Sequence, residues 1–338
     1  MAYQALRQAI APWLPAGAIF AICQSTNGYM LLGTQTRLVR FDGLRFSEVP
    51  ELEELNLPEL WVQCLQQNND GTLWTEHPMY VEVVFTLQRI RELAPQHPEW
   101  RTTMPYQAVL SGDREALAHL SEADFFALVG ATHAGFTSAQ FRETVSAWLA
   151  TTRHPRFNRL YTELVYQPML EVLAYFRANG YKTFIVSGGS LDFIRAFAEK
   201  AYGIPPEQVV GTSFEMRYTF AGDVASTTSQ GSVMLIDDGP GKAIGIDHSI
   251  GRVPSAAFGN SDGDLAMLET TTRSPESGKR KRFAAFVWHT DAVREYAYDR
   301  NTSVGRLDRG LTDAPRLGWQ LIDMKRDWKV VFPFELTK

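Results

Sequence analysis

From residue 154 to the C-terminus, apolar runs of strand length alternate with segments whose apolar residues recur at helical spacing. The stretch YKTFIVSGG, residues 181–189, is an apolar run that ends in a glycine turn, and amphipathic segments precede and follow it. The same order of strand, glycine-rich turn and helix recurs in VPSAAFGNSDGDLAML, residues 253–268, and two further apolar runs, RFAAFVWH and GWQLIDM, follow. Such alternation predicts an α/β fold with a doubly wound, mostly parallel, Rossmann-like sheet, whose ligands bind at the carboxyl ends of the strands.

The first seventy-odd residues instead carry short apolar runs that are separated by Asx-Gly pairs at 27–28, 42–43 and 70–71. Aligning the first pair with the third sets Ile22 against Leu65, at an offset of 43 residues (71 minus 28), which is the length of a four-stranded propeller blade. Both copies read as strand, turn and strand. The stretch QNNDGTLW, residues 67–74, can therefore be the tip of a β-hairpin.

The stretch NGYMLLGTQTRLVRFDGLRF, residues 27–46, resembles the repeat of two-component-regulator propellers in the order of its turn, its Gly-Thr pair and its Arg-Phe-Asp-Gly. Leu31 stands where that family usually has Trp, and Arg37 where it usually has Gly. The match covers fewer than two blades, whereas a propeller closes with roughly four to eight. We therefore expect residues 1–60 to form a small hairpin or propeller-like β segment that is an appendage rather than a working propeller.

Composition and charge narrow the classes of partner. A formal net charge of −5 over 338 residues argues against nucleic acid, because phosphate-neutralising surfaces need excess Lys and Arg. No apolar run reaches membrane-spanning length, so no membrane partner is expected. Cys23 and Cys64 lack metal-ligand spacing and favour a reducing, cytoplasmic location; a periplasmic one follows if the apolar stretch 9–23 is a signal peptide. The sequence leaves the oligomeric state undetermined.

Groups suited to phosphate and a metal follow the predicted strands, and each also has an ordinary structural explanation. Hydroxyl and backbone N–H groups at a helix start bind anions, or they only cap the helix. Oxygen side chains on a tight turn are ligands that Mg²⁺ prefers, or they form a plain Asx-rich turn. A lysine between them binds phosphoryl oxygens, or it is an exposed loop residue. The candidates are Ser187, Gly188, Gly189, Lys242, Asn260, Asp262 and Asp264.

The order of these groups resembles the haloacid-dehalogenase-like phosphohydrolases, particularly their phosphoserine-phosphatase-like branch. The motifs, in chain order, are NDGTLWTEHPMY from residue 69, FIVSGGSLDFIRAFAEKAYGIPPEQVVG from residue 184, Lys242, and GNSDGDLAMLE from residue 259. The similarity spans about residues 68–338. It implies an α/β core of residues 61–75 and 166–338 and a helical cap at 76–165, where amphipathic segments at 80–93 and 139–152 predict helices. It also implies Mg²⁺ as the cofactor and a small phosphorylated molecule as the partner.

In that family the first motif has the form Asp-x-Asp-Gly-Thr, in which the first Asp forms an aspartyl-phosphate and the second is the general acid/base. Because Gly71-Thr72 fixes the register, the resemblance makes Asp70 the acid/base and places Asn68 at the nucleophile position. An amide is a much poorer nucleophile than a carboxylate, so activity is expected to be weak or absent. By the same resemblance the substrate contacts are Thr72, Ser187, Gly188, Gly189 and Lys242, and the metal ligands are Asn68, Asp70, Asn260, Asp262 and Asp264.

The stretch NDGTLW fits both resemblances and is the only place where they coincide, so we hypothesise that the chain is a composite joined there. The alternative is a natural family member with an unusual N-terminus. Three functions stay open: a Mg²⁺-dependent phosphomonoester hydrolase, an inactive module that binds phosphate or a phosphorylated metabolite, and a sensor-type interaction protein that uses the N-terminal β segment. His77 is either a substrate contact or a surface loop histidine. The identity of the substrate is not readable from the sequence.

Overall fold

The computed structural model divides into two units, Met1–Glu59 and Leu60–Lys338, and each is described by itself. The structure describes residues 71–275 and 282–336, except the side chains of Arg114 and Ala118, and the backbone of five strands within residues 21–67. In the first unit four strands pair antiparallel in chain order, around the first two Asx-Gly pairs. They are β1 (Ala21–Gln24), β2 (Met30–Gly33), β3 (Leu38–Phe41) and β4 (Phe46–Glu48). Their resemblance to a propeller blade stays a prediction.

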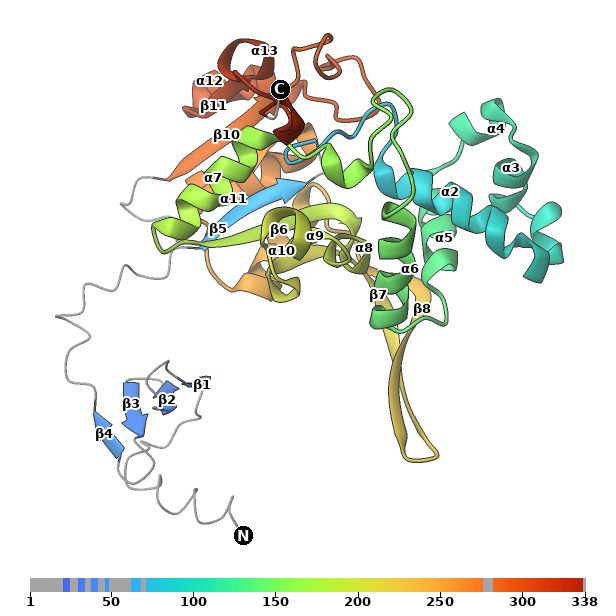
Figure 1. The fold of residues 1–338 in the computed structure, drawn as a ribbon, viewed down its shortest axis with the longest axis horizontal. Helices are drawn as coiled ribbons and strands as arrows, with labels where there is room; N and C mark the ends of the chain where they lie inside the picture. The colour runs from blue at the N-terminus through green and yellow to red at the C-terminus, as the bar shows by residue number, and fades with distance from the viewer. Residues whose placement is uncertain are drawn as a thin grey trace. The chain divides into compact units, whose positions relative to one another are not determined.

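The second unit is built on a seven-stranded sheet with the strand order β11-β10-β9-β5-β6-β7-β8 (Figure 1). Every neighbouring pair is parallel except β7 and β8, which confirms the predicted α/β fold. Because β5 lies in the middle of this sheet, Gln66 and Gln67 at its end belong to the sheet and not to a hairpin. The strands are β5 (Val62–Gln67), β6 (Lys182–Ser190), β7 (Val209–Ala221), β8 (Val224–Leu235), β9 (Ala256–Gly259), β10 (Phe283–Trp288) and β11 (Gln320–Asp323).

Successive residues of a strand point to opposite faces of the sheet, and strand residues on both faces of this sheet are buried. Phe184 and Val186 belong to one apolar cluster, whereas Ile185 belongs to another. The helices of this part of the unit are α7 (Gln167–Ala178), α8 (Leu191–Arg195), α9 (Ala198–Tyr202), α10 (Pro240–Ile250), α11 (Leu265–Arg273), α12 (Arg309–Leu317) and α13 (Met324–Asp327). The helix predicted after β6 is thus broken in two near Phe197, although it ends at left-handed Gly203 as expected.

A helical segment lies between β5 and β6 in the chain and has its own small apolar cluster of Ile90, Trp100, Val109 and Leu128 (Figure 1). We call residues 81–149 the helical insertion. The predicted helices at 80–93 and 139–152 are present as α2 and α6, and Ser121 and Thr137 cap α5 and α6 with their side chains. No helix of the described residues has the length and apolar character that crossing a bilayer needs. The helices are α2 (Val81–Leu93), α3 (Tyr106–Ser111), α4 (Arg114–Ala118), α5 (Glu122–His133) and α6 (Ser138–Leu149).

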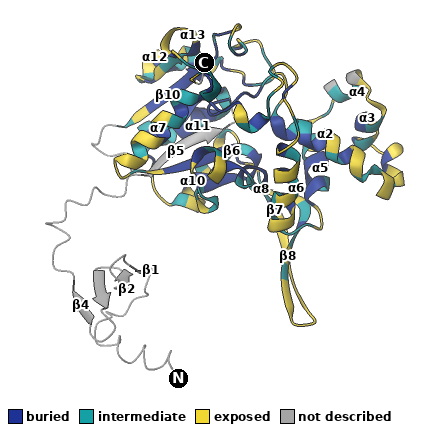
Figure 2. Ribbon diagram, viewed as in Figure 1, coloured by how far each residue is buried: buried dark blue, intermediate teal, exposed yellow. Residues whose placement is uncertain are grey.

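β7 and β8 extend beyond the sheet as a two-stranded ribbon that projects from the second unit (Figure 1). Residues 215–221 of β7 are all exposed, and most of the outer ribbon is yellow in Figure 2. Its exposed apolar side chains include Met216, Tyr218, Phe220 and Val224. The ribbon was not predicted from the sequence.

Candidate functional site

The predicted site residues follow three neighbouring strands of the sheet. In the parallel register Gln67 pairs with Ser187, and Leu65 pairs with Phe258, so β5, β6 and β9 end at the same level. Residues that follow these strands therefore lie at one carboxyl edge of the sheet, where α/β folds bind their ligands. Asn68 and Asp70, the predicted nucleophile position and acid/base, lie outside the described residues.

The predicted glycine turn at 187–189 is a bulge inside β6 rather than a turn after it. Ser187 pairs with Gly211 and Ser190 with Thr212, so Gly188 and Gly189 are extra residues in the strand. Ser187 is fully buried, and its Oγ accepts a hydrogen bond from the N–H of Gly189 (3.1 Å). The bulge thus curls the backbone around the Ser187 hydroxyl at the edge of the sheet.

The segment that follows β5 is joined to the segment that follows β9. The Thr72 hydroxyl donates to Oδ1 of Asn260 (3.1 Å), and Nδ2 of Asn260 donates to Oε1 of Glu76 (2.9 Å). The N–H of Gly71 donates to Oε2 of the same glutamate (3.2 Å). All of these side chains are buried. Two of the predicted motifs therefore meet through direct contacts.

Lys242 is the strongest electrostatic feature of this edge. Its side chain is fully buried, and Nζ lies 2.8 Å from Oδ1 of Asp264, which is fully buried too, and 3.7 Å from Oδ1 of Asp238. Burial lowers the pKa of Lys242 to about 8, and the carboxylates of Asp238 and Asp237 oppose this shift. Oδ2 of Asp264 accepts the N–H groups of Asn260 (2.6 Å) and Ser261 (2.9 Å), so one carboxylate fixes both the lysine and the turn after β9.

Asp237 and Thr212 connect the segment before α10, the helix that carries Lys242, with the bulge of β6. The Thr212 hydroxyl accepts the N–H of Asp237 (3.1 Å) and donates to the carbonyl of Gly188 (2.8 Å). Asp237 is fully buried, and burial raises its pKa to about 7 while nearby Lys242 lowers it. The start of α10 with Lys242, the bulge and the turn at 260–264 therefore form one connected assembly.

Asp262 has a different environment from the metal site predicted for it. Its Oδ1 accepts the N–H groups of Asp308 (3.1 Å) and Gly310 (2.9 Å), and its Oδ2 accepts that of Arg309 (3.1 Å). These amides are at the start of α12, where free N–H groups attract a carboxylate. Both oxygens are thus engaged at a helix N-terminus, which the spacing in GNSDGD alone did not reveal.

A family model for haloacid dehalogenase-like hydrolases matches residues 68–269, which is more than half of the chain. The chain belongs to the haloacid dehalogenase-like hydrolases. The match starts at Asn68, and its range includes all the predicted site residues.

Several solved structures match the chain at low identity, with TM-scores below 0.5. A Bordetella pertussis Tohama I protein with unknown function is 13% identical, with a TM-score of 0.46, and the match covers 78% of this chain and 99% of that chain. A phosphoserine phosphohydrolase-like protein from Francisella tularensis subsp. tularensis SCHU S4 is 17% identical, with a TM-score of 0.33 over 67% of this chain and 86% of that chain. A probable phosphoserine phosphatase from Vibrio cholerae is 14% identical, with a TM-score of 0.36 over 80% and 68%. No curated protein sequence matches the chain.

A buried polar cluster behind Gly71 was missed from the sequence of this haloacid dehalogenase-like chain. His289 donates from Nε2 to the carbonyl of Gly71 (2.6 Å), and its Nδ1 lies 3.1 Å from Oε2 of Glu295. Glu76 is fully buried beside them, and burial raises its pKa to about 7 against the opposing charge of His289. The sequence signal for this cluster was the carboxylate of Glu76, six residues after the motif's acidic position at Asp70. In the structure the residues between them, 71–75, are buried.

His77 is neither a surface residue nor free to contact a ligand with its whole ring. It is half-buried, and its ring lies 4.0 Å from that of Tyr298 and 5.6 Å from that of Tyr296. Its Nε2 donates to the carbonyl of Val304 (3.2 Å). The structure therefore gives His77 a packing role in this family member.

The family's metal can be tested against the side chains that the structure describes. Within them, no group of three or more His, Cys, Asp or Glu residues is arranged to hold a metal ion. Of the predicted ligands, Asn260 is joined to the segment after Gly71, because its Oδ1 accepts from Thr72. An amide oxygen is a ligand that suits a hard cation such as Mg²⁺. Asn68 and Asp70, which the resemblance adds to the ligand set, lie outside the described residues. Asp264 pairs with Lys242 and accepts the backbone N–H groups of Asn260 and Ser261, so it fixes the position of Asn260.

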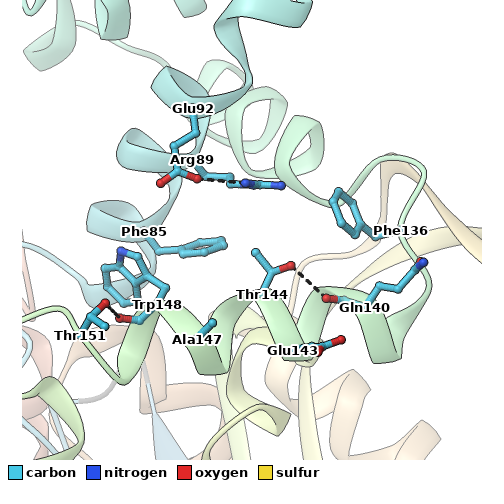
Figure 3. A pocket seen from close by; sticks show the side chains of 10 residues that line it. All are labelled: Phe85, Arg89, Glu92, Phe136, Gln140, Glu143, Thr144, Ala147, Trp148 and Thr151. Atoms are coloured by element: carbon cyan, nitrogen blue, oxygen red, sulfur yellow. Dashed lines mark hydrogen bonds and ion pairs between the residues drawn. The ribbon is translucent and has the colours of Figure 1, made fainter.

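A groove of about 590 Å³ lies elsewhere, between α2 and α6 of the helical insertion (Figure 3). Phe85 and Trp148 line it on the apolar side, and Arg89, which pairs with Glu92 at 2.9 Å, lies across it from Glu143. None of the residues that the family's motifs identify lines this groove. It is thus separate from the candidate site.

Proposed function

We propose that this chain binds the phosphoryl group of a small phosphorylated molecule, and that it is a phosphomonoester hydrolase weakened or inactivated by Asn68. The observation that carries the proposal is the fully buried ammonium of Lys242, held by Asp264 at the carboxyl edge of the sheet beside the β6 bulge. Burying a charge is costly unless its partners offset the loss of water. A positive group kept at this edge supports an anion as the ligand.

The role of each residue in the proposal follows from its position. Ser187, Gly188, Gly189 and Lys242 would bind the phosphoryl oxygens, because charge-assisted hydrogen bonds to anions are the strongest type. Thr72 would bind substrate less directly, since its hydroxyl already donates to Asn260. The helical insertion, within the proposed cap of residues 76–165, would select the rest of the molecule, and residues 61–75 and 166–338 would form the hydrolase core. We place this activity in the cytoplasm.

In the hydrolase reaction, an oxygen of residue 68 attacks phosphorus and the bond from phosphorus to the ester oxygen breaks. Asp70 gives its proton to the departing alcohol; it then takes a proton from the water that displaces residue 68 from phosphorus and releases phosphate. Asn68 lacks the negative charge that makes a carboxylate oxygen nucleophilic, so the first step is slow or does not occur. Asn68, Asp70 and Asn260 would hold Mg²⁺, which would neutralise phosphoryl charge.

Restoring the carboxylate tests this proposal directly. We expect Asn68→Asp to increase release of phosphate from an aryl phosphate in the presence of Mg²⁺ by about 100-fold or more, because residues of a nucleophile unit carry effects of at least that size. The matched control is Asn69→Asp, the same substitution one residue further on, which should have no effect. Equal activity of wild type and Asn68→Asp would mean that position 68 is not the nucleophile.

A binding module is the second candidate, and Asn68 itself is the observation that favours it. If neither wild type nor Asn68→Asp turns over an aryl phosphate while both bind orthophosphate in calorimetric titrations, the chain is a binding module. If neither binds orthophosphate, the site proposal is wrong. The sensor-type function of the N-terminal segment and the composite origin of the chain stay hypotheses that these measurements do not address.

A further inference from the structure

The hydroxyl of Ser190, the residue that ends the β6 bulge, is held by two side chains of the helical insertion. Glu82 of α2 contacts it through Oε1 and accepts the Ser190 N–H through Oε2 (2.8 Å), and Nε2 of His133 in α5 lies 3.1 Å from Oγ. All three residues are buried, with exposures of 5%, 2% and 4% for Glu82, Ser190 and His133. Two helices of the insertion thus meet the bulge at a single side chain.

The position of the protons in this triad follows from its acceptors. Nδ1 of His133 lies 2.9 Å from the carbonyl of Val129, which can only accept, so Nδ1 carries the ring proton. Burial lowers the pKa of His133 to about 4, so the ring is neutral and Nε2 accepts. The Ser190 proton therefore goes to His133. Since a hydroxyl has one proton, the short contact from Ser190 Oγ to Glu82 needs a proton on Glu82.

The surroundings of Glu82 favour this protonated state. Burial raises the pKa of Glu82 to about 7, and its contacts with the Ser190 hydroxyl and N–H only partly oppose this shift. The remaining groups near the triad are the carboxylate of Asp192 in α8, which faces His133, and its partner Arg195 at 3.7 Å. The His133 ring is packed against Phe141 (3.7 Å) and Phe214 (4.4 Å). No cation among these groups lies against Glu82 to hold it ionised.

Ionisation of Glu82 changes two things at the bulge. The Ser190 proton must turn towards the carboxylate, which leaves Nε2 of His133 as a buried acceptor without a donor, at a cost. A negative charge also appears in a low-dielectric interior, against Ser190, which follows Gly188–Gly189. There it repels an anion. Both effects act against a phosphoryl group at the bulge. Below the transition neither effect is present.

We propose that Glu82 is a positioning residue of the phosphoryl site, whose carboxyl proton links α2 and α5 to the β6 bulge and whose ionisation weakens anion binding there. This inference rests on the proposed function, because it assumes that the bulge binds phosphoryl oxygens. It adds that the helical insertion controls anion binding through the carboxyl proton of Glu82, although Glu82 does not itself contact the ligand.

Glu82→Gln is the informative variant, because its amide copies the protonated acid. Its Nε2–H can donate to Ser190 Oγ and its Oε1 can accept the Ser190 N–H, and neither changes with pH. We would titrate both proteins with orthophosphate by calorimetry at pH 5.5 and pH 8.5 and compare them at each pH, so that the titration of phosphate itself cancels. We expect equal dissociation constants at pH 5.5 and about threefold to tenfold weaker binding by wild type at pH 8.5. Glu92→Gln, on the exposed side of the same helix, should match wild type at both values.

Thermal unfolding gives a second readout that does not need a ligand. The folded state keeps the Glu82 proton up to a pKa of about 7, whereas the unfolded state releases it near 4.5, so stability falls as pH rises between these values and is level above them. The melting temperature of Glu82→Gln relative to wild type should therefore rise between pH 5 and pH 8. If that rise occurs but neither protein binds orthophosphate, the phosphoryl site is wrong and the proton link stands. A difference in binding or melting that is the same at every pH would overturn the link.

Discussion

Two carboxylates in the turn after β9, only two residues apart, have opposite surroundings. Asp264 is fully buried against the ammonium of Lys242, while Asp262 accepts three backbone N–H groups at the start of α12. The charge of the first is balanced by a cation, and the charge of the second by helix amides. The difference arises from which element each side chain meets, because the local sequence GNSDGD is common to both.

If Asp262 is an anchor for α12, removing its oxygens should cost stability. We expect Asp262→Ala to lower the free energy of unfolding in urea by about 1–2 kcal/mol, the usual cost of losing an N-terminal helix cap. Asp262→Asn should cost much less, since an amide oxygen still accepts N–H groups. A metal ligand would behave in the reverse way: both variants would lose Mg²⁺ affinity and keep the wild-type stability without metal.

At the residue scale, the sequence was informative where function depends on the order of groups along the chain. Ser187, Lys242 and Asn260 were found in this way, and the structure connects them. Glu76 and His289 were missed because they are polar residues distant in sequence whose meeting is created only by the fold. No periodicity or spacing predicts a buried polar contact across more than two hundred residues.

At the scale of elements, apolar periodicity predicted the central strands and the long helices, because their burial on one or both sides dictates residue choice. It does not by itself describe the β7–β8 ribbon. Residues Glu215 to Phe220 alternate strictly between polar and apolar, which is typical of a strand with one buried face, yet all of them are exposed. The alternation correctly indicates a strand. It does not show that the apolar face of this strand is left uncovered by the described part of the chain.

Shortening the ribbon tests that description. Replacing residues 219–226 with an Asn-Gly turn joins Tyr218 to Thr227, which are paired in the register, and keeps the Ser229 hydrogen bonds to Gly135 and Phe136. Because the removed side chains are largely exposed, we expect the melting temperature to change by less than about 2 °C. Light scattering on the same samples would show whether the molar mass changes as well. A loss of more than about 5 °C would mean that the ribbon tip has a stabilising partner.

At the scale of the whole molecule, the division into units falls before β5 and not at the shared stretch NDGTLW. β5 carries the residue choice that resembles the N-terminal repeat, but its partners on both sides, β6 and β9, belong to the hydrolase sheet. The resemblance implies a hydrolase core that starts at residue 61, and β5 (Val62–Gln67) pairs in parallel with both of its neighbours in the sheet. The sequence resemblances allow β5 to come from the N-terminal repeat or from the hydrolase core. Its packing fits both origins, because a central strand needs only apolar residues and two neighbours.

Two truncations that differ by eleven residues separate the roles of the N-terminal unit and of β5. We expect the chain without residues 1–59 to unfold cooperatively, with a melting temperature within about 2 °C of the full chain, because every strand of the hydrolase sheet is retained. The chain without residues 1–70 lacks β5, so β6 and β9 lose the strand between them and a row of backbone hydrogen bonds is left unpaired in the middle of the sheet. That variant should be insoluble or lack a cooperative transition in circular dichroism. If the shorter deletion also abolishes the transition, the first unit is part of the folding unit; if the longer deletion does not, β5 is dispensable and its central position is wrong.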